Sequence, residues 1–333
     1  MNIGLFKLSS LGDVVHALPV AATLRARVPD ARITWVVEKR EAAVLAGHPA
    51  LERILTVDTR GWRRSLAPEA LAASWRELTA LARELRGARF DVALDLQALM
   101  KSAVLVGLTR APLRIGFWLG WSREPLSVIG ATRHVRPPVT AHHVVDQYLS
   151  LLAPLGVTDP VREFRLPSDP ASEARMDEFF AAASLKPRNR VVVLNSGAGR
   201  SEKRWPIERF RALASTLAAS GRVEVVVVWG PGEEAAARAI AGVADPHVVL
   251  APPTDLLALI ALLRRASVMV AADTGPLHLA AALGTPCVGL YGPTTAERNG
   301  PYGAGHRTLQ AADGRVESIA VADVARLVLE LLG

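Results

Sequence analysis

The chain has 333 residues, half of them hydrophobic, and one cysteine, Cys287. This length and composition exclude a disordered protein, a single small domain and a framework of internal disulfides. The formal net charge of +7 lies in the first half: residues 1–165 hold 22 Lys and Arg against 15 Asp and Glu, and residues 166–333 hold 17 of each. An anionic partner for the N-terminal half, or a solvated basic surface, would account for this asymmetry.

The N-terminus and the apolar runs indicate a cytoplasmic protein. Lys7 and Asp13 interrupt the first apolar stretch, which therefore lacks the pattern of a signal peptide. The most hydrophobic runs, 223–229 and 268–272, have the length of buried strands and are far too short to span a membrane. Cys287 is expected to be a small buried apolar residue.

The first half of the chain alternates short apolar runs with amphipathic segments. Apolar runs of this length predict buried strands, and the segments between them predict helices. This alternation is typical of parallel βαβ units in a doubly wound sheet. The predicted strands are 2–8, 33–38 and 90–96, and the predicted helices are 14–27, 68–86 and 101–108.

The pattern loosens around residues 155–184, where one glycine and three prolines indicate a domain boundary. The alternation then restarts, so each half opens with a strand, a loop of small residues and a helix. The sequence therefore predicts an α/β protein of two doubly wound Rossmann-like domains facing each other across a cleft. The predicted strands here are 190–195, 223–229, 247–250, 268–272 and 287–291, and the predicted helices are 172–183, 207–219, 233–241, 256–265, one that ends at 283, and 321–332.

The first motif that indicates chemistry, residues 7–13, follows the first predicted strand. Doubly wound sheets bind ligands at the carboxyl ends of their strands, which is where this motif lies. Gly12 allows a tight turn, and Asp13 stands at the start of the next helix. A carboxylate there could act on a ligand or serve as an N-cap for the helix, and the motif alone favours neither.

The second motif, residues 195–206, takes the chain from a strand into a glycine-bearing loop with basic residues. Backbone N–H groups, the start of a helix at Pro206 and the ammonium of Lys203 could together hold a phosphate. Gly197 and Gly199 lack the third glycine of a dinucleotide fingerprint, and the loop is not a P-loop. The alternative is a solvated basic loop.

The third motif, residues 273–278, follows another predicted strand. Thr274 suits an N-cap and Pro276 a first helical turn, so the N–H groups near Gly275 are placed to bind an anion. His278 falls in the first turn of that helix, where it is either a ligand contact or a packed core residue. In a fourth loop, Glu233 could accept hydrogen bonds from ribose hydroxyls or cap its own helix.

Several absences narrow the chemistry. The sequence has no Asp-x-Asp pair to hold a divalent metal under a diphosphate, no zinc-ligand spacing and no nucleophile elbow. We therefore expect no metal and no cofactor. An enzyme without metal must neutralise a leaving diphosphate with cationic side chains and backbone dipoles, and the loops described above supply such groups.

Taken together, these motifs resemble the bacterial heptosyltransferases of glycosyltransferase family nine. The resemblance covers nearly the whole chain, and its specificity lies in the order and spacing of the motifs. The residues that carry it are 7–19, 35–38, 95–102, 122–125, 203–206, 273–278 and 291–294.

The resemblance implies a GT-B fold, with an acceptor-binding domain at 1–165, a donor-binding domain at 166–317 and a last helix, 318–333, that returns to the first domain. It implies an inverting, metal-independent transfer of L-glycero-D-manno-heptose from ADP-heptose to the Kdo of Kdo₂-lipid A, in lipopolysaccharide inner-core biosynthesis. The implied partners are this donor, this anionic lipid and the cytoplasmic face of the inner membrane, where the enzyme would be peripheral. No nucleic acid is implied.

The resemblance also assigns roles to residues. Asp13 is implied as the general base, and Lys203 as a catalytic cation at the donor phosphates. Members of the family often carry a threonine pair where this chain has Ala198 and Gly199, so hydroxyl contacts to the donor would come from Ser196 or Ser201. The donor-binding residues expected are Ser196, Ser201, Lys203, Glu233, Asp273, Thr274, Gly275 and His278, and those expected at the anionic acceptor are Arg60, Arg63, Arg64, Lys101 and Arg123.

Three other interpretations stay open at this point. Lys203-Arg-Trp-Pro206 is also common in enzymes that add the second heptose, so a second-heptose or other core-sugar transferase is the first alternative. A nicotinamide-dependent oxidoreductase is disfavoured by the missing third glycine. A non-catalytic nucleotide-binding module would bind ADP without turnover.

Overall fold

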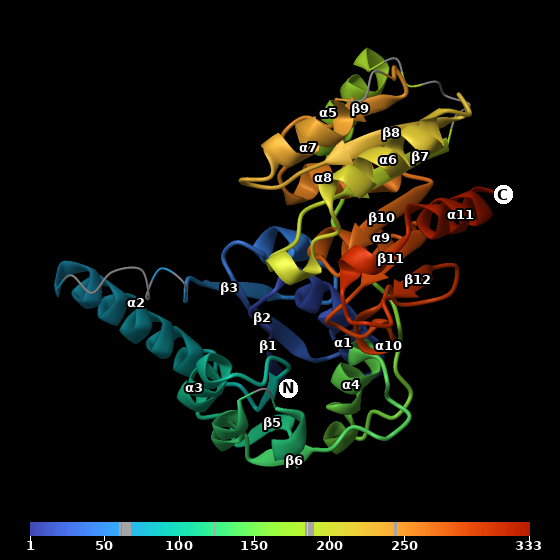
Figure 1. Cartoon of the computed structure of the whole chain (residues 1–333). Coiled ribbons are helices and arrows are strands. Elements are labelled where there is room, and N and C mark those ends of the chain that lie inside the picture. The colour runs from blue at the N-terminus through green and yellow to red at the C-terminus, as the bar shows by residue number, and fades with distance from the viewer. Residues whose placement is uncertain (60, 62–67, 123, 184, 186–189, 243–244) are drawn as a thin grey trace. The chain divides into compact units, whose positions relative to one another are not determined.

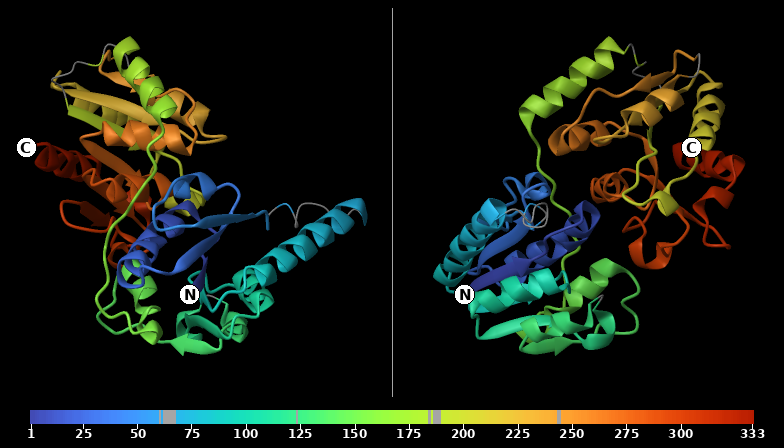
Figure 2. Two further views of the ribbon diagram at one scale, coloured as in Figure 1. Left: turned by 180° about the vertical axis from the view of Figure 1, so that it is seen from behind. Right: turned by 60° about the vertical axis from the view of Figure 1, so that its left-hand side comes forward.

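The computed structural model describes the whole chain except residues 60, 62–67, 123, 184, 186–189 and 243–244. The chain divides into two compact units, Met1–Arg165 and Leu166–Gly333. This boundary falls in the region where the sequence pattern loosens. Figures 1 and 2 show an open sheet in each unit with helices on both faces.

The first unit is a six-stranded parallel sheet in the order β3-β2-β1-β4-β5-β6. The order reverses direction beside β1, which is where doubly wound sheets bind ligands. Helix α1 packs against α4, and α2 packs against α3 (Figure 1). The elements are β1 (Asn2–Phe6), α1 (Leu11–Arg27), β2 (Arg32–Glu38), η1 (Ala42–Leu45), β3 (Arg53–Val57), α2 (Pro68–Gly87), β4 (Val92–Asp95), α3 (Met100–Thr109), β5 (Leu113–Phe117), η3 (Leu119–Trp121), η4 (Pro125–Gly130), β6 (Arg133–Val135), α4 (Val144–Ser150) and η5 (Ala153–Leu155).

The second unit repeats this plan with a parallel sheet in the order β12-β11-β10-β7-β8-β9. Counted from β7, its strand order is the same as in the first unit. The elements are α5 (Pro170–Ala182), β7 (Arg190–Asn195), η6 (Ser201–Lys203), α6 (Ile207–Ala218), β8 (Val223–Val228), α7 (Glu234–Ala241), β9 (Val248–Leu250), α8 (Leu256–Arg264), β10 (Val268–Ala272), α9 (Gly275–Ala282), β11 (Cys287–Tyr291), α10 (Ala296–Asn299), β12 (Arg307–Gln310), η7 (Val316–Ser318) and α11 (Val321–Leu332).

Each unit has its own apolar core, because the central strands are apolar on both faces, as parallel sheets require. In the first unit one layer joins β1 and β4 to Leu81 and Leu85 of α2. In the second unit the strands pack on α6, α7 and α11, with Trp205 and Phe210 fully buried. Cys287 is buried at the start of β11, as expected, and burial raises the pKa of its thiol.

Helix α11 packs against α6, β10 and β11, and it is part of the second unit. The expected return of residues 318–333 to the first domain concerns the arrangement of the two units and stays a prediction.

Candidate functional site

The carboxylate of Asp13 lies in the first turn of α1 rather than at its cap. The helix begins at Leu11, three residues earlier than the pattern predicts, and its N-cap is Ser10. The Asp13 Oδ2 atom accepts hydrogen bonds from the backbone N–H of Ser10 at 3.1 Å and from its Oγ at 2.9 Å. The interpretation of Asp13 as an N-cap is therefore wrong, although its carboxylate does stabilise the helix start.

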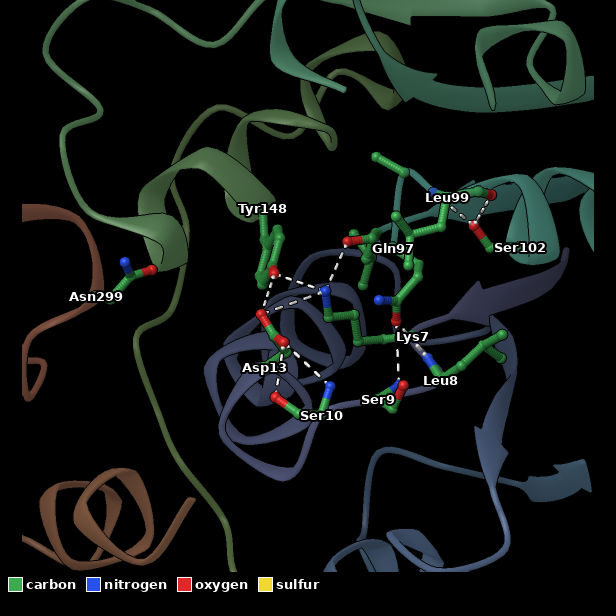
Figure 3. A network of polar contacts seen from close by, with 12 residues as sticks. Lys7, Leu8, Ser9, Ser10, Asp13, Gln97, Leu99, Ser102, Tyr148 and Asn299 are labelled. Atoms are coloured by element: carbon green, nitrogen blue, oxygen red, sulfur yellow. Dashed lines mark hydrogen bonds and ion pairs between the residues drawn. The ribbon is translucent and has the colours of Figure 1, made fainter. Parts of the chain in front are cut away.

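A buried lysine and a tyrosine hold the other oxygen of Asp13 (Figure 3). Lys7 Nζ donates to Tyr148 Oη at 2.7 Å and to the carbonyl of Leu96 at 3.1 Å, and it lies 3.7 Å from Asp13 Oδ1. Tyr148 Oη in turn donates to Asp13 Oδ1 at 3.2 Å. The Lys7 side chain is 3% exposed and that of Asp13 is 29% exposed. Asp13 is thus the member of this cluster that solvent, or a bound hydroxyl, can reach.

The loop before Asp13 is held by the end of the neighbouring strand, β4. Gln97 Oε1 accepts hydrogen bonds from the backbone N–H groups of Leu8 at 3.0 Å and Ser9 at 3.1 Å. Gln97 is itself fixed by Asp95, whose Oδ1 accepts from the N–H groups of Gln97 and Ala98 at 3.0 Å. Burial raises the pKa of Asp95, although these hydrogen bonds favour its charged form. Ala98 has a left-handed backbone, φ 55°, which is uncommon in a residue with a Cβ.

Lys101, expected at the acceptor, has its ammonium bound within the first unit. Its Nζ lies 3.1 Å from Ser9 Oγ and 3.3 Å from Glu38 Oε1. The buried Glu38 carboxylate also accepts from the N–H and the hydroxyl of Thr59. Lys101 therefore links the Asp13 loop to the segment that follows β3. The other residues expected at the acceptor, Arg60, Arg63, Arg64 and Arg123, lie outside the described residues.

In the second unit, Asp273 is the centre of a polar cluster. Its Oδ2 accepts from Lys203 Nζ at 2.5 Å and from Thr294 Oγ1 at 2.9 Å, and its Oδ1 lies 3.1 Å from His278 Nε2. Burial alone would raise the pKa of Asp273, but the hydrogen bonds and positive charge of His278 and Lys203 hold it well below its usual range. The cluster therefore contains a permanent carboxylate, and Lys203 already has a counter-ion.

Buried neighbours fix the loop that carries Lys203. Trp205 is fully buried, and its Nε1–H donates to the carbonyl of Ile319 at 3.0 Å. Arg204 Nε donates to the carbonyl of Ala198 at 3.1 Å. Residues 204 and 205 of the Lys-Arg-Trp-Pro motif thus anchor the loop, while Lys203 extends to Asp273.

The remaining donor candidates lie at the carboxyl ends of β7 and β10. Thr274 is the N-cap of α9 and Gly275 its first residue, and Asn195 Nδ2 lies 3.4 Å from Thr274 Oγ1. Ser196 is buried directly after β7, whereas Ser201 is exposed at the start of η6. The structure therefore brings Thr274 and Gly275 to the Lys203–Asp273 pair and leaves Ser201 at the surface.

Glu233 lies against the loop after β7, from the loop after β8. A Cβ on Gly197 would stand 2.1 Å from Glu233 Oε2, so the Glu233 carboxylate would have to move if residue 197 carried one. The same oxygen accepts from the N–H of Gly230 at 3.0 Å. The missing Cβ of Gly197 thus leaves room for the Glu233 carboxylate, a contact that the spacing of the two glycines does not reveal.

Sequence reasoning missed four residues of these clusters. Lys7, Asn195 and Thr294 stand inside motifs that the sequence analysis recognised. The motifs therefore indicated their positions but not which side chains they contact. No sequence motif indicated Tyr148, because it lies in α4, 135 positions after Asp13.

The described residues form neither a metal site nor a helix that could span a membrane. Among them no three His, Cys, Asp or Glu side chains lie close enough together to hold a metal ion. No helix formed by these residues has both the length and the apolar character to cross a bilayer.

Two doubly wound sheets of the same strand order, each with a charged cluster beyond its strand ends, place the chain among the two-domain Rossmann-like α/β proteins, which bind ligands at such strand ends. The model of glycosyltransferase family 9 (heptosyltransferase) matches residues 78–319, and the chain belongs to this family. It is therefore a glycosyltransferase, and its family acts in lipopolysaccharide core biosynthesis.

Curated relatives agree with this assignment over most of the chain. Lipopolysaccharide heptosyltransferase 1 of Escherichia coli K12 is 31% identical over 93% of this chain and 94% of its own. Lipopolysaccharide heptosyltransferase 1 of Pseudomonas aeruginosa PAO1 is 32% identical over 91% of this chain and 82% of its own.

Solved structures agree as well. E. coli heptosyltransferase WaaC with ADP is 28% identical, with a TM-score of 0.82 over 99% of this chain and all of that one. WaaC with ADP-2-deoxy-2-fluoro heptose has a TM-score of 0.80, at 28% identity over 99% of both chains. The predicted family and GT-B fold are confirmed.

Proposed function

We propose that the enzyme transfers L-glycero-D-manno-heptose from ADP-heptose to the Kdo of Kdo₂-lipid A, with inversion and without a metal. The observation that carries the proposal is the Asp13 cluster, a partly exposed carboxylate held at a strand end by Lys7 and Tyr148. The relatives named heptosyltransferase 1 favour this acceptor, and the fluoro-heptose bound to WaaC favours this donor.

The second unit supplies a site for the donor diphosphate. The first N–H groups of α9, beyond Thr274, carry the positive end of the helix dipole. Lys203 adds a cation, part of whose charge Asp273 neutralises, and His278 contacts the other oxygen of the same carboxylate. Glu233 is assigned to the ribose hydroxyls. Fixed dipoles and cations of this kind stabilise charge that develops on a leaving diphosphate.

The first unit supplies the base. Asp13 removes the proton from a hydroxyl of the acceptor Kdo as that oxygen forms a bond to C1 of the heptose. The bond from C1 to the phosphate oxygen breaks on the opposite face, and ADP leaves with the electron pair. Ser10 and Tyr148 hold the two carboxylate oxygens in place while one of them takes the proton.

A transfer assay tests the proposal. Incubation with ADP-heptose and Kdo₂-lipid A should add the mass of one heptose, and excess EDTA should leave the rate unchanged, because Lys203, His278 and backbone dipoles take the place of a metal. Loss of transfer in EDTA, restored by Mg²⁺ or Mn²⁺, would contradict the metal-independent mechanism.

The same assay separates the proposed acceptor from the alternative one. Kdo₂-lipid A and an acceptor that already carries one heptose are offered in parallel, each in deacylated form. Addition to the second acceptor alone would identify a second-heptose enzyme, and binding of ADP with no transfer to either would indicate a non-catalytic module.

The hydroxyl of Tyr148 gives a prediction about pH. Tyr148→Phe keeps the ring but removes the donor to Asp13 Oδ1, so the ionised carboxylate is less favoured. We expect kcat/KM to fall about tenfold at neutral pH and the acid limb of its pH profile to move to higher pH. Tyr302→Phe, which removes a hydroxyl in the second unit, is the control. A fall in kcat/KM by the same factor at every pH would show that Tyr148 supports only the fold.

We also propose that the enzyme is cytoplasmic and peripheral to the inner membrane, because Kdo₂-lipid A is a membrane lipid. The excess positive charge of residues 1–165 suits an anionic acceptor in that unit.

A further inference from the structure

Large apolar side chains are exposed on the two short helices that follow β5. Leu126 and Ile129 of η4 are 70% and 71% exposed, and Trp118 and Leu119 at η3 are 54% and 50% exposed. In a 3₁₀-helix, residues three apart lie one above the other, so Leu126 and Ile129 share one outward ridge. Several exposed apolar side chains gathered in one place mark an interaction site more often than a chance surface.

Hydrogen bonds and close packing attach the patch to the rest of the first unit. The Ser122 hydroxyl, between η3 and η4, contacts that of Ser127 and donates to the carbonyl of Ala98 at 3.1 Å. Helix η4 also packs on α3 so closely that a Cβ on Gly130 would stand 2.7 Å from Ala103 Cα. The apolar side chains are therefore held outward by a fixed scaffold.

The part of the patch that directly follows β5, Trp118 and Leu119, lies at the same edge of the sheet as Asp13. Strands β1, β4 and β5 are parallel, so the segments that follow them emerge at one edge. Asp13 follows β1, Gln97 follows β4, and Trp118 follows β5. A continuous set of bonds joins them, because Gln97 holds the Asp13 loop and the adjacent Ala98 holds Ser122.

Residues 98–140, which contain the patch, hold six basic residues and one acidic residue. Glu124 is the acidic residue between positions 98 and 140, and its carboxylate accepts the N–H of Met100 at 2.6 Å. A second copy of the chain would bring the same positive charge against this surface in an isologous contact. An anionic bilayer would attract it. The basic residues of this stretch are Lys101, Arg110, Arg114, Arg123, Arg133 and Arg136.

We propose that Trp118, Leu119, Leu126 and Ile129 insert into the surface of an anionic bilayer and dock the first unit on it. Tryptophan and leucine are side chains that enter the headgroup boundary, and a net positive charge in the same stretch of chain favours anionic lipid. This docking surface rests on the proposed function and deepens it. Docking at this edge would present a hydroxyl of a membrane lipid on the side of the sheet where Asp13 lies.

Vesicle flotation tests the docking surface. The whole protein is mixed with vesicles of phosphatidylcholine alone or of phosphatidylcholine with phosphatidylglycerol. We expect binding to the anionic vesicles, and a loss of at least about tenfold in the partition coefficient for L126N/I129N, which removes two large apolar groups from the bilayer. Leu329→Asn changes a similarly exposed leucine of α11 in the second unit and should bind as the wild type does.

Turnover of a deacylated, water-soluble acceptor separates this inference from the proposed function. L126N/I129N should keep wild-type kinetics on it and lose rate only on acceptor embedded in vesicles. Transfer by a wild-type protein that binds no vesicles would overturn the docking surface alone, and vesicle binding without any transfer would overturn the proposed function alone. The docking surface would also be refuted if L126N/I129N bound the anionic vesicles as well as the wild type does. The same holds if the wild type were a dimer and the substitutions made it a monomer without changing vesicle binding.

Discussion

Asp13→Asn is expected to lower turnover by about 10²–10⁴-fold, because asparagine cannot take the proton of the acceptor hydroxyl. Asparagine keeps one side-chain oxygen, which can still accept the hydrogen bonds of Ser10. Donor affinity should stay near the wild-type value, since the donor is assigned to the second unit. Steady-state kinetics on a deacylated acceptor and titration with ADP measure the two effects separately.

Asp13→Asn is also expected to lower the stability of the protein more than the loss of a simple helix cap would. Lys7 is buried 3.7 Å from Asp13, so Asp13→Asn leaves its ammonium with Tyr148 and the Leu96 carbonyl but without its carboxylate. We expect the free energy of unfolding to fall by about 1–3 kcal/mol. Lower activity of Asp13→Asn could then result from a smaller fraction of folded protein. A second variant is needed to separate the two causes.

Lys7→Met combined with Asp13→Asn provides that separation. The double variant has no uncompensated buried charge, and replacement of an ion pair by uncharged groups of similar volume is often close to neutral for stability. We expect its melting temperature to recover most of the loss while its turnover stays as low as that of Asp13→Asn. Recovery of turnover together with stability would show that Asp13 is structural and that the base lies elsewhere.

The alternation of apolar runs was enough to predict both sheets, but not all of their strands. Strands β3, β6 and β12 escaped prediction; β6 has three residues, and β12 is exposed along most of its length. Strand β5, which pairs with both β4 and β6, also escaped prediction, because Arg114 interrupts its apolar run. The Arg114 side chain is satisfied by the carbonyls of Gly130 and Ala111, contacts that no local pattern encodes.

The candidate site shows the same limit at the level of contacts. Motifs at strand ends pointed to Asp13, Lys203 and Asp273 as candidates, because a doubly wound sheet binds its ligands there. Their partners depend on tertiary packing. The pairing of Lys203 with Asp273 joins residues 70 positions apart, and nothing in either motif indicates that one neutralises the other.

Lys203 is expected to show the second large effect. Lys203→Ala should lower kcat/KM by roughly 10²-fold or more, as loss of one preorganised group at a developing charge does. Donor affinity should fall as well, because a cation beside the diphosphate acts in the ground state and in the transition state. Lys203→Arg should restore only part of the rate, since a planar guanidinium does not replace a compact ammonium.

Arg200→Ala is the matched control for charge on this loop. Arg200 is exposed and paired with Glu202 at 3.2 Å, so its loss removes one positive charge without touching Asp273. If the loop acted only as a solvated basic surface, the two variants would behave alike. We expect Arg200→Ala to stay near the wild type in both donor affinity and turnover.

The ion pair with Asp273 gives Lys203 two separable tasks, since it both neutralises a buried carboxylate and faces the proposed diphosphate. In Lys203→Ala, the pKa of Asp273 rises, but His278 still favours its charged form, so the donor meets a carboxylate that has lost one counter-ion. Asp273→Asn added to Lys203→Ala removes that repulsion. We expect the double variant to regain part of its affinity for ADP, measured by titration calorimetry, while turnover stays low because no ammonium stabilises the leaving diphosphate. Full recovery of turnover would instead assign Lys203 to the neutralisation of Asp273 alone.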